Sequence, residues 1–233
     1  MKNVSESTDT AKSALSPEQI LNVAVTIADR EGLAAVSMRR LGRELSVTPM
    51  ALYWHFEDKD RLVDAMAERV VAHGQFDDTP SDHWGQRLRS VLTGLVALLH
   101  EHPWMGRPVI ERLVPLPNYL AALEIILDST RQAGLGPQEG AVLAQQAVQA
   151  VVALAEHEPE TQTDSTALTA QYVAQYDYLA SLPNEQYPNI RAAASPLTGP
   201  QDLEDYYRLG IDMVVGGIAA IADTSPTAPR HGR

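Results

Sequence analysis

The chain has 233 residues, 45% of them hydrophobic, so it can form one large domain or a small domain joined to a larger one. It contains no cysteine, which excludes disulfide scaffolds, zinc–thiolate sites, iron–sulfur clusters and thiol nucleophiles. The opening residues are polar and no apolar run is long enough to cross a bilayer, so we expect no signal peptide, no membrane association and a cytoplasmic location.

The formal net charge is −12 at pH 7, but the charges are unevenly distributed. Residues 1–62 carry 8 basic and 9 acidic side chains, whereas residues 63–233 carry 10 basic and 21 acidic ones. Residues 37–56 hold three arginines and a single acid. An acidic body discourages non-specific docking on nucleic acid, and a locally basic segment can still approach phosphates. This distribution permits DNA binding and does not by itself establish it.

A strong helix-start signal follows a polar N-terminal segment. We expect residues 1–15 to be disordered, because they offer few apolar anchors. Ser16 is a favourable N-cap, Pro17 suits the first helical position, and Gln19 completes a capping box. Apolar residues at 20, 23, 24 and 27 then recur at helical spacing, and Gly32 is expected to end the helix in a left-handed conformation.

Three more helices are predicted next. One follows Ser37 and extends to about Leu45, and residues 46–47 form a tight turn. Thr48 caps the next helix with a proline at its first position, and the fourth helix covers residues 59–73. Two short helices joined by a tight turn fit the B-DNA major groove, which is about 12 Å wide. A small apolar core can pin them, from residues 27, 41, 45, 47 and 52.

The rest of the chain also has helical periodicity, and no convincing two-residue alternation indicates strands. We therefore predict an all-α fold. The segment 137–157 is so rich in alanine and valine that we expect little of it to face water. Helices are expected at 84–100, 118–133, 137–157, 167–182 and 202–222, with a proline-bounded segment at 103–117, an acidic loop at 158–165 and a proline-rich connection at 183–200.

The N-terminal third resembles the tetracycline-repressor (TetR) family of transcriptional regulators. The matching run covers residues 20–70, and its most specific piece is LYWHF at residues 52–56, followed by Lys59 and Leu62. Beyond this run the resemblance is only architectural. It implies a helix-turn-helix domain (16–62, with the fourth helix bridging to about 74), a larger helical effector-binding and dimerisation domain (63–223) and a tail (224–233) that we expect to be disordered.

The resemblance also assigns the residues that contact DNA. It implies that Arg39 contacts a base or a phosphate, that residues 48–51 face base edges, and that Tyr53, His55 and Lys59 hold phosphates. The full predicted set is Ser37, Met38, Arg39, Thr48, Pro49, Met50, Ala51, Tyr53, Trp54, His55 and Lys59.

Packing roles compete with DNA roles at several of these positions. For Leu52 and Phe56 we favour the core. Tyr53 is expected to pack its ring and point its hydroxyl at a phosphate, whereas Trp54 fits packing and DNA contact equally well. Met50 and Ala51 lack hydrogen-bonding side chains, so they can recognise only thymine methyl groups, which leaves Arg39 and Thr48 as the main polar readers. Arg40 and Arg43 are expected to be solvated or paired with Glu31 or Glu44.

The family implies that the last long helices pair two subunits in a four-helix bundle, and the sequence agrees. Two adjacent glycines lie within the 202–222 helix, where each costs about 1 kcal/mol relative to alanine unless close packing offsets it. An intramolecular core is the alternative. We prefer the dimer because a two-fold pair reads a palindrome with half-sites about 34–36 Å apart. The predicted interface is Ala144, Ala147, Val148, Val151, Tyr206, Leu209, Gly210, Met213, Gly217 and Ile221.

An effector pocket is implied by the family and suggested by glutamines that interrupt an otherwise apolar helix, since a buried amide needs a partner. We expect a flat or mostly apolar small molecule, although plain core packing competes at each aromatic position. The predicted lining is Met66, Trp84, Leu88, Val91, Leu95, Trp104, Met105, Tyr119, Leu123, Gln145, Gln146, Gln149 and Tyr172.

No cofactor or metal site is expected. The candidate cation ligands near residues 73, 100–102 and 156–158 lie in solvent-type sequences, and His73 falls out of register with the tetracycline-binding members of the family. A helical enzyme is disfavoured because no GxSxG, P-loop, GxGxxG or HExxH motif occurs. A helical adaptor without DNA affinity is disfavoured by the cluster of Tyr53, His55 and Lys59. The sequence thus predicts a homodimeric regulator, a repressor rather than an enzyme, that binds a palindromic operator and is released by a small molecule.

Overall fold

The computed structural model describes residues 15–74, 76, 83–106, 110, 116–159, 166–199 and 201–224, with the side chains of 166–169 left out. Every regular element in these ranges is helical, which confirms the all-α prediction. The elements in chain order are α1 (Pro17–Glu31), η1 (Leu33–Ala35), α2 (Met38–Glu44), α3 (Pro49–Tyr53), α4 (Lys59–His73), α5 (Trp84–Glu101), η2 (Pro103–Met105), α7 (Pro117–Gln132), α8 (Pro137–Glu156), α9 (Thr166–Ser181), α10 (Pro188–Ala192), α11 (Ala194–Thr198) and α12 (Leu203–Thr224).

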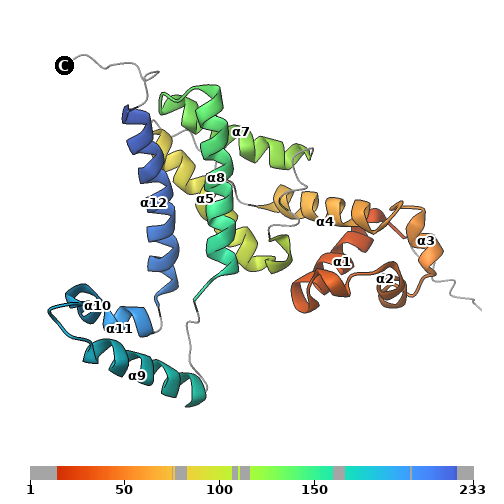
Figure 1. Ribbon diagram of the computed structural model, residues 1–233. Coiled ribbons are helices and arrows are strands. Elements are labelled where there is room, and N and C mark those ends of the chain that lie inside the picture. The colour runs from red at the N-terminus through yellow and green to blue at the C-terminus, as the bar shows by residue number, and fades with distance from the viewer. Residues whose placement is uncertain are drawn as a thin grey trace, which may run out of the picture.

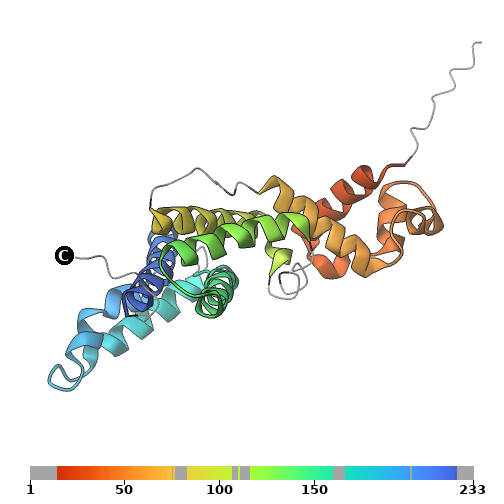
Figure 2. The ribbon, with the colours of Figure 1, turned by 90° about the horizontal axis from the view of Figure 1, so that it is seen from above.

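The chain forms an elongated molecule with a small head at one end (Figures 1 and 2). The head consists of α1, α2 and α3, and α4 leads from it toward the body. In the body, α5 packs against α7, α8 and α12. An arm of α9, α10 and α11 projects at the far end, and its main contacts are internal. None of the described helices is long and apolar enough to cross a membrane.

The predicted helix starts in the head are confirmed in atomic detail. Ser16 accepts a hydrogen bond from the Gln19 backbone N–H, and the Gln19 side chain accepts one from the Ser16 N–H. Gly32 ends α1 at a φ of +81°, a backbone conformation that favours glycine. The cap of the fourth helix was not predicted: Asp58 accepts a hydrogen bond of 2.8 Å from the Arg61 backbone N–H.

One apolar core continues from the head into the body. Of the predicted small core of the head, Ile27, Leu41 and Leu52 are buried, whereas Leu45 and Val47 are partly buried and pack against it. The fully buried Ile20 belongs to the same core. Leu62 and Met66 of α4 carry it onward, so the bridging helix belongs to both parts. In the body the core is closed by Leu88, Leu92, Ile126, Val151, Ile211 and Val215.

Two fold expectations are wrong. Helix α8 is not largely buried, since Val142 is 53% exposed and three glutamines are exposed beside it. The proline-rich connection contains two short helices, because a proline at the first position of a helix loses no internal hydrogen bond and Pro188 starts α10 there. Residues 1–14, 225–233 and most of the 103–117 segment and of the 158–165 loop lie outside the described residues; Leu15 packs against the core.

Candidate nucleic-acid interface and internal cavity

The turn between α2 and α3 depends on a glycine. The Val47 backbone N–H donates a 2.9 Å hydrogen bond to the Gly42 carbonyl, and Ser46 between them has a φ of +54°. A Cβ on Gly42 would lie 2.9 Å from the Val47 carbonyl oxygen, closer than real Cβ contacts. The turn lies where the sequence predicts it, but the importance of Gly42 was not predicted; a glycine inside a short helix before a turn is the signal for it.

Helix α3 buries one side chain and exposes most of the others. Leu52 is fully buried and Phe56, just after the helix, nearly so, which confirms the core role for both. Met50 is 68% exposed and Trp54 85% exposed, so core packing of Trp54 is wrong. Tyr53 is half-exposed. The Thr48 hydroxyl caps the helix by accepting from the Ala51 backbone N–H at 3.4 Å.

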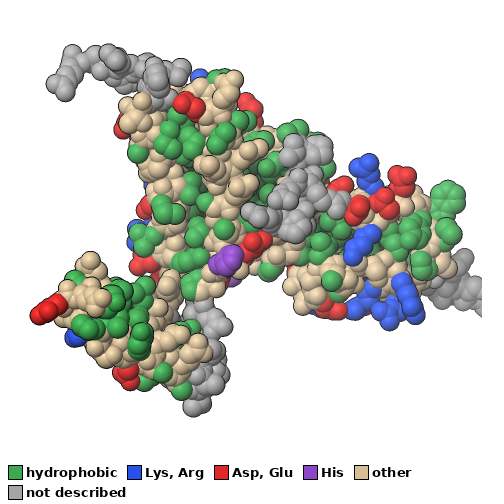
Figure 3. Space-filling view, in the orientation of Figure 1, with side chains coloured by type: hydrophobic (Ala, Val, Ile, Leu, Met, Phe, Trp, Pro, Cys, Tyr) green, Lys and Arg blue, Asp and Glu red, His purple; other side chains and the backbone are tan. Residues whose placement is uncertain are grey.

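The basic residues of the head differ in how they are paired. Arg40 donates to both Glu31 oxygens at 2.9 and 3.0 Å and to Glu44 at 2.9 Å, as predicted. These hydrogen bonds, first to Glu31 and then to Glu44, raise the pKa of Arg40. Arg39 is exposed and forms no ion pair with the described part of the chain. Figure 3 shows Lys and Arg side chains gathered along one edge of the head.

The remaining residues of the predicted interface lie at its borders. His55 and Lys59 are exposed, and the Lys59 ammonium is 3.5 Å from the Leu33 carbonyl oxygen. The Ser37 hydroxyl accepts from the Arg40 backbone N–H at 3.2 Å and so caps α2. Met38 is predicted to face DNA, but its side chain is 7% exposed and lies in the core, because it shares the inner face of α2 with Leu41 three residues later.

A small cavity of about 30 Å³ lies in the body, between the end of α4, α5, η2, α7 and α8; we call it the apolar chamber. Five predicted pocket residues, Val91, Leu95, Met105, Tyr119 and Leu123, lie in its wall. Burial raises the pKa of Tyr119, so its phenol stays protonated. The other described wall residues are Val71, Phe76, Leu98, Ile110, Ala122, Ile126 and Val148.

The other predicted pocket residues lie elsewhere. Met66 and Leu88 are fully buried core residues, Trp84 is half-buried at the start of α5, and Tyr172 belongs to the projecting α9 arm. Trp104 donates its indole N–H to Asp29. The inference of buried amides is wrong, because α8 turns its Ala/Val stripe inward and the helical repeat then places three residues on the exposed face: Gln145, Gln146 and Gln149.

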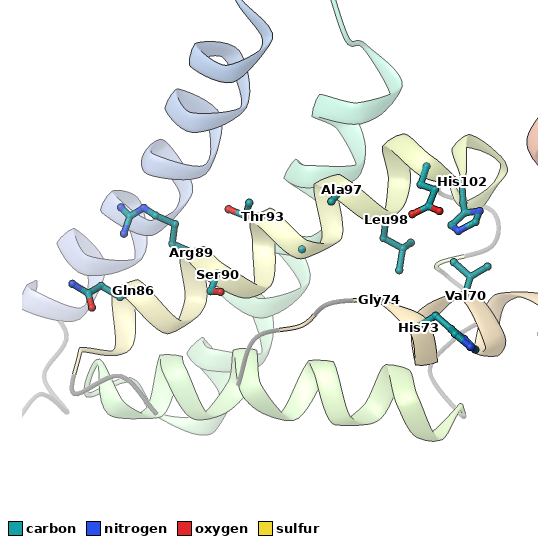
Figure 4. A pocket seen from close by; sticks show the side chains of 12 residues that line it. Val70, His73, Gly74, Gln86, Arg89, Ser90, Thr93, Ala97, Leu98 and His102 are labelled. Carbon is teal, nitrogen blue, oxygen red and sulfur yellow. The ribbon is translucent and has the colours of Figure 1, made fainter. Parts of the chain in front are cut away.

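A second, open cavity of about 700 Å³ follows the polar face of α5, and we call it the α5 groove (Figure 4). His73 and Gly74 at the end of α4 form one side of it. Ser90, Thr93 and other polar residues of α5 line its length. Leu98 lines both the groove and the apolar chamber, so a single side chain separates them at that point. The groove was not predicted, although the polar spacing along α5 is a sequence signal for it.

The predicted dimer residues divide into two groups. Ala144, Ala147, Val148 and Val151 are buried within the subunit itself. On α12, Leu209 is 58%, Met213 71% and Ile221 43% exposed, and Gly217 is also exposed. Val142 is exposed on α8, which packs against α12, and we call these exposed residues together the α8–α12 outer face. Two residues instead join α12 to α8: Gly210, which lies against Leu154, and Tyr206, whose hydroxyl donates to the Leu154 carbonyl.

The histidines considered as cation ligands have separate partners. His73 Nδ1 lies 2.7 Å from the Arg69 carbonyl and His157 Nδ1 3.0 Å from the Ala153 carbonyl. His102 pairs with Asp29 at 2.8 Å and His100 with Glu158 at 3.4 Å. Within the described ranges, no three potential ligands come together around one point.

Comparison with known proteins gives two family matches that together cover most of the chain. Residues 20–66 match the model of bacterial regulatory proteins of the tetR family. Residues 76–222 match the model of the tetracyclin repressor-like C-terminal domain. The second match alone spans more than half of the chain.

Individual proteins agree with the family matches. An HTH-type transcriptional regulator of Saccharopolyspora erythraea is 26% identical over 217 residues, which is 91% of this chain and 87% of that protein. The HTH-type transcriptional repressor DrrR1 of Streptomyces coeruleorubidus is 32% identical over 129 residues, 55% of this chain and 48% of that protein. The crystal structure of the Streptomyces coelicolor TetR family protein ActR in complex with actinorhodin superposes with a TM-score of 0.75 at 26% identity, covering 91% of this chain and 99% of ActR. The chain therefore belongs to the TetR family of helix-turn-helix transcriptional regulators.

Proposed function

We propose that the protein is a repressor that binds a palindromic operator as a homodimer and leaves it when a small molecule binds the body. The observation that carries this proposal is the exposure of α3. Helix α3 has five residues and buries Leu52, whereas Met50 and the following Trp54 face solvent. Burial within the subunit therefore stabilises this helix through few side chains. A partner that covers the exposed side chains explains the arrangement, and a helix of this size fits the major groove.

The head offers the two kinds of contact that DNA recognition needs. Arg39 and the residues at the start of α3 are proposed to read base edges, with Met50 and Ala51 limited to thymine methyl groups. Tyr53, His55 and Lys59 are proposed to hold phosphates at the end of α3 and the start of α4, which fixes the register of the head on the duplex. Trp54 is assigned to the same surface by its exposure.

The α8–α12 outer face is proposed to pair two subunits. Leu209, Met213 and Ile221 are separated by four and eight residues, which places them on one face of α12, and Val142 is exposed on the neighbouring α8. Exposed apolar side chains that form one stripe mark an interaction site more often than scattered ones do. A two-fold pair through this face presents two heads, as a palindrome with half-sites one helical turn apart requires.

The apolar chamber is proposed as the effector site, and the effector as a flat, mostly apolar molecule. All of the described wall is apolar except Tyr119, whose protonated phenol can donate one hydrogen bond. The complex of ActR with actinorhodin supports a small-molecule site in this fold. A space of about 30 Å³ holds about one water molecule, so an effector has to displace the walls. We assign the protein no catalytic role, and a cytoplasmic location, where operator DNA lies.

Selection from a random pool of DNA duplexes tests the function, because it requires no assumption about the operator sequence. We expect enrichment of a palindrome, and binding that weakens steeply with salt because phosphate contacts release counterions. Trp54→Ala should weaken binding, whereas Tyr178→Ala, which removes a similarly exposed aromatic ring from α9, should not. The proposal fails if no sequence is enriched even at low salt.

The effector half of the proposal needs its own experiment. Compounds that raise the melting temperature of the protein are titrated against its complex with the selected duplex. We expect stabilising compounds that are flat and apolar to release the DNA, with a coupling of about 1–3 kcal/mol. A complex that resists every stabilising compound contradicts the assignment of the chamber.

A further inference from the structure

Two carboxylates connect the head and α4 to the body by hydrogen bonds. The first is Asp29 on α1. Its Oδ1 accepts from the indole N–H of Trp104 at 2.7 Å and lies 2.8 Å from Nδ1 of His102. Both partners belong to the segment of η2 that follows α5 directly. We call this contact the Asp29 joint.

The second carboxylate is Glu68 on α4. Its Oε1 accepts from the backbone N–H of Asn118 at 3.0 Å and from the Asn118 side-chain amide at 2.7 Å. Leu116, the residue before α7, has no side-chain oxygen to cap that helix, so Glu68 satisfies one of its free N–H groups and places negative charge at its positive end. Glu68 Oε2 is buried without a hydrogen-bond partner in the described part of the chain. We call this contact the Glu68 joint.

Both joints are built on the wall of the apolar chamber. Trp104 is followed directly by Met105, a fully buried wall residue. Asn118 is followed directly by Tyr119, and Glu68 lies three residues before Val71 on the same helix. A molecule larger than the chamber that pushes η2 or α7 outward therefore displaces the same backbone that carries the joint partners.

We propose that Asp29 and Glu68 are positioning residues that convert the filling of the chamber into a new orientation of the reading head. This inference rests on the proposed function and names its regulatory route. One joint alone leaves the head free to pivot about it, and two joints on different helices fix its direction. Apolar contacts between helices tolerate small sliding, whereas hydrogen bonds weaken steeply with distance and angle. Movement of η2 and α7 thus pulls α1 and α4 with it.

The test measures the separation of the two heads in the homodimer. The chain has no cysteine, so Arg43→Cys places one spin label on the exposed face of each head, and pulsed electron paramagnetic resonance gives the distance between them. Ala122→Leu adds three carbon atoms to a wall residue and so fills the chamber in place of an effector. If this variant does not fold, Val148→Ile is used, which adds one carbon atom to the wall.

We expect Ala122→Leu, or Val148→Ile in its place, to shift the distance between the labels and to weaken binding to the selected duplex about tenfold. With Asp29→Ala and Glu68→Ala added, which removes the acceptor of both joints, the distances should spread over a wider range and no longer respond to the wall substitution. Asp29→Asn, which keeps an oxygen for Trp104, should restore much of the response. Asp128→Ala is the matched control, because it removes a carboxylate paired within the body and should leave the response intact.

Two results overturn the inference: a normal response in the joint variants, or no movement of the heads in any wall variant. The absence of any distance between labels contradicts the homodimer instead, which is part of the proposed function. In that case labels at Arg43→Cys and Gln138→Cys within one chain measure the head against the body and still decide the role of the joints.

Discussion

Arg39 and Arg40 are neighbours in sequence and differ completely in their surroundings. Arg40 is held by two glutamates within the head, one on α1 and one on α2, so its charge is already compensated. Arg39 has no such partner in the described part of the chain. Because Met50 and Ala51 cannot hydrogen-bond to bases, base selection by polar contact depends on few side chains, and Arg39 is the strongest donor among them.

Arg39→Ala tests this division. We expect the substitution to weaken binding to the selected duplex by about 1–3 kcal/mol and to relax the preference at one base position of each half-site. Arg40→Ala is the comparison and should mainly lower the stability of the head. Both effects are measured by gel-shift titration against single-base variants of the duplex. If the Arg39→Ala protein and the parent protein discriminate equally between the single-base variants, Arg39 does not read a base.

Gly42→Ala is a second test at the level of single residues. The added Cβ meets the Val47 carbonyl oxygen of the turn at 2.9 Å, and backbone cannot move away as a flexible side chain can. We expect a loss of about 1–3 kcal/mol in stability, as for other overpacked sites, and weaker DNA binding because α3 is displaced. Gly136→Ala, where no atom lies within 4 Å, serves as control in thermal unfolding. A similar melting temperature for both variants argues against the tight turn.

Among the helices, those with local signals were predicted best. Ser16 and Pro17, and Thr48 and Pro49, mark helix starts because capping involves only residues within one turn. The orientation of α8 was not predicted. Alanine and valine occur both on buried faces of helices and on exposed ones, so their presence alone does not show which face of α8 packs against the core. The Asp29 and Glu68 joints link residues 50 to 75 positions apart, and no local pattern announces such a pair.

The contact between α5 and α7 gives a prediction about pH. Hydrogen bonds from Arg131, and from Arg87 and Gln132, lower the pKa of Asp128 below its usual value. The ionised form therefore stabilises the fold; this stability is complete above the unfolded pKa of about 3.9 and is lost as pH falls through the lower folded pKa. We expect Asp128→Asn to lower the free energy of unfolding by about 1–2 kcal/mol at pH 7, and the difference from the parent to shrink as the pH falls below the unfolded pKa and through the lower folded one.

Urea unfolding at several pH values measures that difference. Asp205→Asn is the control, since Asp205 pairs with Arg208 on the exposed face of α12, where ion pairs contribute little. A difference between Asp128→Asn and the parent that persists unchanged into acid shows that the carboxylate charge is not the cause.

At the scale of the whole molecule, the outer face of α8 and α12 is an exposed apolar surface in the described part of the chain. Leu209, Met213 and Ile221 are exposed in the single chain, and the glutamines of α8 lie on the exposed side of the neighbouring helix. The sequence predicted the α12 half of this surface from its apolar stripe. It misassigned the α8 half, whose alanines and valines pack inside the subunit.

Met213→Glu tests the pairing of subunits. A charge at the centre of an apolar interface has to be buried without a partner, so we expect the dimer to dissociate and the affinity for the palindrome to fall with it. Leu197→Glu, at a similarly exposed position on α11, should change neither property. Sedimentation velocity gives the mass of each variant. If the Met213→Glu protein has the same mass in solution as the parent, the subunits do not pair through this face.

The surroundings of two tryptophans have a practical consequence. Trp54 stands 85% exposed at the tip of the head, and Trp104 is nearly buried with its indole bound to Asp29. Their emission maxima should therefore differ: the exposed indole of Trp54 should emit at a longer wavelength than the enclosed indole of Trp104. With Trp84 replaced by phenylalanine, a single emission spectrum separates docking on the duplex from opening of the Asp29 joint, so the order of the two events can be followed in real time without any added dye.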